Sequence, residues 1–141
     1  MSKYKASRQV AQVEDFNYRL GIKQCVDALK GEQLKHLVSL RVEMLKEELA
    51  ELEAAVNVED AEETVDAVVD IVYFGIGTLL LMDVDVEAAV DEVHLANMEK
   101  IRGVKPERVN PLGLPDAIKP EGWVAPSHED NHGRFKEIWG N

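Results

Sequence analysis

Two stretches of the sequence carry the pattern from which the architecture follows: Arg41-Val-Glu-Met-Leu-Lys-Glu-Glu-Leu-Ala-Glu-Leu-Glu53 and Glu62-Glu-Thr-Val-Asp-Ala-Val-Val-Asp-Ile-Val-Tyr-Phe74. In both, apolar residues recur at the spacing of an α-helix. Carboxylates fall on or beside the face that each helix should bury, and burying unpaired carboxylates costs several kcal/mol each. The sequence therefore predicts two helices that meet at an acidic seam, and this seam needs a compensating positive charge.

Four helices and an irregular tail are predicted around these stretches. The helices are expected over Ser7–Leu29, with a break at Leu20-Gly21-Ile22, and over Gly31–Val56, Ala61–Met82 and Val86–Ile101. No segment shows the alternation of a strand. The short Asn57–Asp60 connector implies antiparallel neighbours, and both Asp60 and Asp85 are suitable helix caps. We expect an all-α fold, a four-helix antiparallel bundle over residues 1–102.

The remaining segment, residues 103–141, is expected to be a C-terminal extension packed on the same domain. It holds all five prolines and shows no clear helical period. A short final helix is predicted near Phe135–Trp139, and Trp123 is a candidate for pinning the tail to the body.

Composition excludes several classes of protein. The 141 residues are 45% hydrophobic and 30% charged, with a formal net charge of -11, which is typical of a globular chain and argues against a nucleic-acid partner. Cys25 is the single cysteine, so no disulfide framework is expected. The N-terminus lacks an apolar leader, and the longest apolar run, Ile71–Met82, is too short to span a bilayer. We expect a cytoplasmic protein without a membrane partner.

The acidic residues of the first stretch can share one ion. Glu48 lies inside the apolar stripe together with Arg41, and Glu51 lies beside the stripe, one turn on from Glu47 and Glu48. Carboxylates at this spacing point to the same side of a helix, where they repel one another unless a cation is held between them.

The second stretch is apolar nearly all round, as in a buried helix, yet four acids form one narrow stripe: Glu62, Glu63, Asp66 and Asp70. A salt-bridged face, with Arg41 or a lysine as partner, is one explanation. So many acids with so few bases favour the other, a hard divalent cation such as Mg²⁺ with oxygen ligands. On the predicted fourth helix, Asn97 and Lys100 could contact a phosphate, or else bridge helices and face solvent.

Three motifs occur in order along the chain: Glu47-Glu48-Leu-Ala-Glu51, Asp66-Ala-Val-Val-Asp70-Ile-Val-Tyr73-Phe-Gly-Ile-Gly77-Thr78 and Val93-His94-Leu-Ala-Asn97-Met98-Glu-Lys100. From about Val13 to Ile101 the chain resembles the MazG-like, all-α nucleoside triphosphate pyrophosphohydrolases. It is most similar to their phosphoribosyl-ATP pyrophosphohydrolase-like branch of phages and bacteria. One departure is Ala67, which stands three residues before Asp70 where the family pattern has Glu. We take Asp66 as the replacement, and the role of Glu63 stays open.

The resemblance implies hydrolysis between the α and β phosphates of a nucleoside triphosphate, which yields a nucleoside monophosphate and pyrophosphate. This reaction would serve nucleotide-pool housekeeping. By the resemblance, Mg²⁺, with Mn²⁺ as a substitute, would be held by four ligands: Glu48, Glu51, Asp66 and Asp70. Glu47 would take the proton of a bound water or bind a further metal. Asn97 and Lys100 would position phosphates, and Phe16 would stack on the base or simply pack in the core.

Three alternatives stay open at this stage. The substrate could be phosphoribosyl-ATP, since the motifs are shared within the family. The chain could be a redox di-metal carboxylate bundle, although it has no Glu-x-x-His on its core helices. It could also be a non-enzymatic helical interaction module. Because a short bundle with an acidic seam is incomplete, we expect a homodimer or homotetramer.

Overall fold

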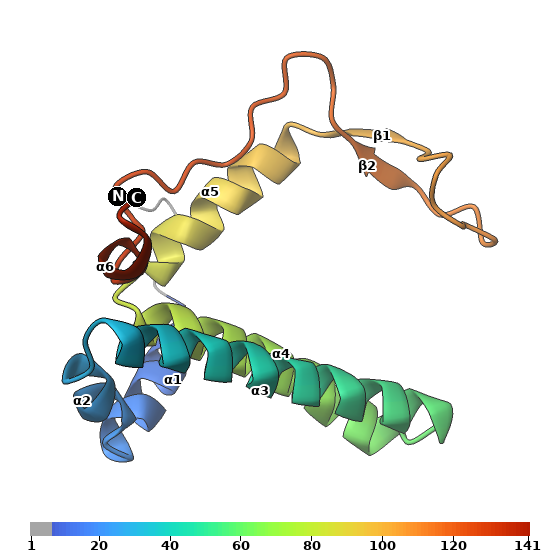
Figure 1. Ribbon diagram of the computed structural model, residues 1–141. Helices are drawn as coiled ribbons and strands as arrows, with labels where there is room; N and C mark the ends of the chain where they lie inside the picture. Colours follow the sequence, from blue (N-terminus) through green and yellow to red (C-terminus); the bar gives the residue numbers. More distant parts are fainter. Residues whose placement is uncertain (1–6) are drawn as a thin grey trace.

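The computed structural model describes residues 7–141, and its centre is a long antiparallel helix pair. This pair consists of α3 (Glu32–Asn57) and α4 (Ala61–Leu81), which run side by side along most of their length (Figure 1). Asp60 begins α4, because its side chain accepts a hydrogen bond from the backbone N–H of Glu63 at 3.0 Å. The predicted all-α class and the antiparallel arrangement of this pair are confirmed. The first six residues, where we expected no apolar leader, lie outside the described part.

Two short helices precede the pair. The expected break divides the first predicted helix into α1 (Arg8–Arg19) and α2 (Ile22–Asp27), and Gly21 between them has the left-handed φ of 73° that favours glycine. The buried core lies at this end of the molecule, where α2 meets the start of α3 and the end of α4; it comprises Val26, Leu34, Leu81 and Met82. The opposite end of the α3–α4 pair therefore extends beyond the core.

The next helix, α5 (Val86–Met98), contacts the end of α4 and then diverges from the α3–α4 pair (Figure 1). Asp85 caps it as expected, accepting a hydrogen bond from the backbone N–H of Ala88 at 3.1 Å. Because of this divergence, closure into a four-helix bundle is not seen within the described part of one chain. The helix also ends at Met98, three residues before the predicted boundary.

The expectation of no strand is wrong. A short antiparallel ladder pairs β1 (Ile101–Gly103) with β2 (Asp116–Ile118), and Arg102 lies opposite Ala117. Strands of three residues are too short to show a period of two, so the sequence pattern could not indicate them. The two strands belong to a hairpin that extends away from the helices (Figure 1).

The chain then returns to the helical body. Asn131 bonds both the backbone N–H and the backbone carbonyl of Asp85, at 2.8 and 2.9 Å. Gly133 has a φ of 53° and lies so close to the carbonyl of Met82 that a β-carbon there would approach it to 2.0 Å, which only glycine avoids. The predicted final helix is present as α6 (Phe135–Trp139), and its Phe135 packs against the buried core.

Arg134 holds this return in place. Its guanidinium donates to the carbonyls of Val26 and Leu29, at 2.8 and 2.6 Å, and to the carboxylate of Glu137 at 2.9 Å. These carbonyls lie at and just after the C-terminal end of α2, and the Val26 carbonyl also accepts a hydrogen bond from the backbone N–H of Leu29 at 2.9 Å. The side chain is only 11% exposed, so the bonds are shielded from water.

We expect Arg134→Ala to lower the free energy of unfolding by about 2–3 kcal/mol, because charge-assisted bonds to the Val26 and Leu29 carbonyls are lost. The matched control is Lys46→Ala, since Lys46 is 66% exposed and pairs only with Glu43 on the same helix. That change should cost less than about 0.5 kcal/mol. Urea unfolding followed by circular dichroism measures both variants, and equal costs would contradict the proposed role of Arg134.

Candidate metal centre

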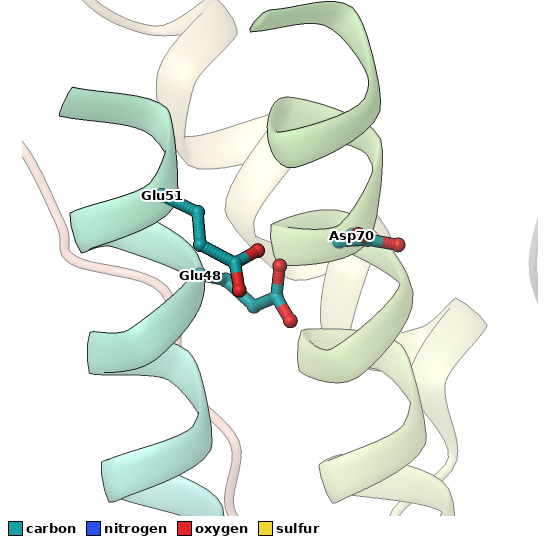
Figure 2. A group of neighbouring side chains, drawn as sticks. All are labelled: Glu48, Glu51 and Asp70. Atoms are coloured by element: carbon teal, nitrogen blue, oxygen red, sulfur yellow. The ribbon is translucent and has the colours of Figure 1, made fainter. Parts of the chain in front are cut away.

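Three carboxylates from α3 and α4 converge at one point. Glu48 and Glu51 are three residues apart on α3 and therefore share a face, and Asp70 reaches the same place from α4. One carboxylate oxygen of each residue lies within 4.8 Å of the others. Figure 2 shows the two glutamates extending from α3 toward α4, where Asp70 is located. We call these three residues the carboxylate cluster.

Glu48 is the most perturbed member of the cluster. Its Oε2 atom is buried and has no hydrogen-bond partner among the residues that the structure describes. Burial, and then the negative charges of Glu51 and Asp70, raise the pKa of the Glu48 carboxyl from its ordinary value of 4.5 to about 7. When it is ionised, such a buried carboxylate destabilises the native state unless a positive charge lies close to it.

No side-chain cation supplies that charge within residues 7–141, where none of the three carboxylates forms an ion pair. The suggestion that Arg41 pairs with the acids is wrong. Its guanidinium donates instead to the hydroxyl of Thr78 and the carbonyl of Phe74, both at 3.0 Å, and it lies 5.0 Å from the centre of the Phe74 ring. Gly77 leaves room for it, since a β-carbon there would lie 3.0 Å from Arg41 Nη2. Burial lowers the pKa of Arg41.

The donor set fits a hard divalent cation. All three side chains offer carboxylate oxygens, which Mg²⁺, Mn²⁺ and Ca²⁺ prefer, and the cluster has no imidazole or thiolate to favour zinc. The buried Oε2 of Glu48 would gain a partner from such an ion. Few protein ligands are usual for Mg²⁺, which keeps several of its waters.

The other residues expected at the site lie in different surroundings. Glu47 and Asp66 are exposed on α3 and α4, outside the cluster of three. Asn97 is exposed on α5, and the ammonium of Lys100 lies 5.2 Å from the centre of the Trp123 ring. Because α5 diverges from the α3–α4 pair, one chain does not bring Asn97 and Lys100 to the cluster (Figure 1).

An aromatic pair lies next to the cluster along α4. Phe16 of α1 is 41% exposed, and its ring meets that of Tyr73 edge to face, with centroids 5.6 Å apart. Tyr73 follows Asp70 by three residues and so shares its face of α4. The sequence indicated Phe16 alone as a stacking residue, although the helical spacing of Tyr73 from Asp70 is a signal that also identifies Tyr73.

Comparison with known protein families identifies one family that matches this chain. The family model of phosphoribosyl-ATP pyrophosphohydrolase matches residues 24–97, just over half of the chain. The match runs from α2 to α5 and includes the whole carboxylate cluster, whereas Phe16, Lys100 and residues 103–141 lie outside it. No curated protein matches the chain.

The raised pKa of Glu48 predicts how metal binding depends on pH. Without metal, the contribution of Glu48 to stability is present below pH 4.5 and is lost as the pH rises through about 7. A bound cation needs the ionised carboxylate, so the stabilisation by Mg²⁺ should grow over the same window. In calorimetric melts, we expect Mg²⁺ to raise Tm more at about pH 8 than at about pH 5.5.

The variant that tests this assignment is Glu48→Gln, which should lose most of the pH-dependent rise. The exposed Glu32 at the start of α3 provides the control, and Glu32→Gln should behave as the parent chain does. The same Mg²⁺ response in all three proteins would show that the ion binds elsewhere.

Proposed function

Because this chain belongs to the phosphoribosyl-ATP pyrophosphohydrolase family, whose members hydrolyse phosphorus-containing anhydrides, we propose that it is a Mg²⁺-dependent nucleoside triphosphate pyrophosphohydrolase. The reaction would break the bond between the α and β phosphates and release a nucleoside monophosphate and pyrophosphate. The observation that carries the proposal is the carboxylate cluster, which among the described residues has an unpartnered buried oxygen and forms no ion pair. A polyphosphate substrate carries bound Mg²⁺, and this ion would supply the positive charge that the acidic seam needs.

In this proposal the cluster residues and Asp66 hold the divalent ion. When bound, the ion neutralises phosphate charge and lowers the pKa of a water ligand. Glu47 is solvent-exposed and precedes Glu48 by one residue, so its carboxylate is available to accept the proton of the attacking water. Asp66 lies one turn before Asp70 on α4 and would reach the ion through a water molecule.

The base would lie against the aromatic pair. Phe16 and Tyr73 together present an edge-to-face surface one turn from Asp70, and half-exposed rings are suited to stacking on a planar base. Asn97 and Lys100 remain proposed contacts to the phosphates. They would have to reach the cluster of a neighbouring copy, because α5 carries them away from the cluster of their own chain.

Phosphoribosyl-ATP is the second candidate substrate, since the matching family model bears its name. The redox di-metal alternative is less well supported, because no histidine joins the three carboxylates. For a non-enzymatic module, the orphaned oxygen of Glu48 would be an unexplained cost.

We also propose that the chain works as a homodimer or homotetramer. It exposes 10342 Å², whereas a compact monomer of 15.8 kDa exposes about 7,300 Å². The difference is about 3,000 Å² per chain, as much as one chain contributes to the largest obligate interfaces. Much of the surplus is apolar, and α4 alone leaves four valines at least 46% exposed: Val65, Val68, Val69 and Val72.

The apolar character of α4 has a second explanation. By length and composition it could cross a membrane, although the core helices of soluble proteins pass the same test. We favour a second copy as its partner and a cytoplasmic enzyme. We further propose that residues 103–141 form an extension of the helical domain, supported by the hydrogen bond of Trp123 Nε1 to the Ala96 carbonyl at 2.8 Å.

The enzymatic proposal is tested by product analysis. Purified protein is incubated with Mg²⁺ or Mn²⁺ and a panel of ribo- and deoxyribonucleoside triphosphates, with phosphoribosyl-ATP included. We expect monophosphate and pyrophosphate in equal amounts from at least one substrate. Glu48→Gln and Asp70→Asn should lower kcat/KM at least about a hundredfold with the helical signal kept, whereas Glu32→Gln, at a position that is 78% exposed, should not. Full turnover in both cluster variants would refute the site assignment.

The assembly is tested by light scattering on the parent chain at micromolar concentration. We expect the mass of two or four chains, because the exposed apolar surface of α4 needs a cover. A monomer under these conditions would contradict the proposed oligomer.

A further inference from the structure

The segment that follows α5 is basic in an acidic protein. Residues 100–119, called here the basic arm, hold five basic and two acidic residues, although the chain has a net charge of -11. The arm leaves the helices and extends to the side (Figure 1). Five apolar residues on it are at least 55% exposed: Ile101, Val104, Val109, Leu112 and Leu114. Such exposure usually marks an interaction surface.

The arm holds its shape by itself. Within residues 101–118, all hydrogen bonds and ion pairs stay inside the segment, including the pair of Arg108 with Asp116 at 3.1 Å and the bond from the Lys105 N–H to Asp116 at 3.0 Å. In the described chain, the side chains of Arg102 and Lys105 form no ion pair. The arm is therefore ordered, and within the described chain Arg102 and Lys105 remain available to pair with another molecule.

The complementary surface is the far half of the α3–α4 pair. Residues 43–70, called here the acidic half, hold eleven acidic residues and one basic residue. Exposed apolar residues accompany these acids, among them Leu49, Val58 and Val65. Both the acidic half and the arm extend to the same side of the molecule, but they are held apart because α5 diverges from the pair (Figure 1).

We infer that the basic arm of one copy binds the acidic half of a second copy, so that Arg102 and Lys105 lie beside the partner's carboxylate cluster. The two surfaces match in charge and both carry exposed apolar residues. A two-fold dimer forms the contact twice, which suits the surplus of exposed surface. A nucleic acid would suit the arm alone and would be repelled by the neighbouring acids.

The contact between copies would bring cationic side chains to the carboxylate cluster. The cluster offers only carboxylates, whereas a triphosphate is a polyanion that also needs cationic side chains. The partner's Arg102 and Lys105 would supply them. This last step rests on the proposed function, whereas the contact between copies does not.

A charge swap tests the contact. Arg102→Glu with Lys105→Glu reverses the arm, and Glu53→Lys with Glu59→Lys reverses exposed positions of the acidic half. In sedimentation velocity without nucleotide or metal, each double variant should dissociate about a hundredfold more readily than the parent, because like charges then meet. An equimolar mixture of the two should associate more tightly than either variant alone, since the glutamates introduced into the arm then meet the introduced lysines.

The control is Lys35→Glu with Lys136→Glu, the same change of charge at exposed positions outside the arm. It should leave the parent mass unchanged. The inference is overturned if the arm-reversed protein dissociates no more readily than the parent, if the mixture stays dissociated, or if the control dissociates equally. Loss of binding to a duplex oligonucleotide with no change of mass would also overturn it.

The contribution to the site needs a kinetic readout. Arg102→Gln with Lys105→Gln is assayed at a concentration where sedimentation shows it still assembled. We expect KM to rise about tenfold with kcat nearly unchanged, because the lost contacts bind substrate and transition state alike. An unchanged KM would show that Arg102 and Lys105 do not contact the substrate. Absence of turnover in the parent chain would refute the proposed function, and the sedimentation result would still decide the contact between copies.

Discussion

Repulsion among three carboxylates is the constraint on which the rest of this structure depends. Glu48, Glu51 and Asp70 meet between two helices, and within residues 7–141 no basic side chain pairs with them. A chain that needed only a stable helical pair would place apolar residues there. The acids instead create a demand for positive charge, which a divalent ion and, in our inference, a second copy would meet.

The residues that stabilise the fold lie at a different end of the α3–α4 pair from the residues of the candidate metal centre. The buried core gathers where α2 meets the start of α3 and the end of α4, and Arg134 ties the C-terminal segment to that same end. The carboxylate cluster lies away from it, on the half of the helix pair that has acids and exposed apolar residues. Exposed apolar residues such as Leu49, Val65 and Val69 accompany the acids on this half.

Local features of the sequence predicted the helices well, and tertiary features limited the rest. Asp60 and Asp85 cap helices where expected, and Gly21 breaks the first helix, because caps and breaks depend on neighbouring residues only. Helical spacing likewise indicated Glu48, Glu51 and Asp70. It could not indicate that Arg41 bonds Thr78 and Phe74, since that depends on how α3 and α4 face each other. Nor could it give the direction of α5, which separates Lys100 from the cluster, or strands of three residues.

The central claim is that the carboxylate cluster holds a divalent ion, and the most direct measurement is anomalous diffraction from crystals of the protein soaked in Mn²⁺. The account predicts an anomalous peak between Glu48, Glu51 and Asp70, about 2.2 Å from at least one carboxylate oxygen of each helix. A peak only elsewhere on the protein, or none at saturating Mn²⁺ with the three side chains in clear density, would contradict it.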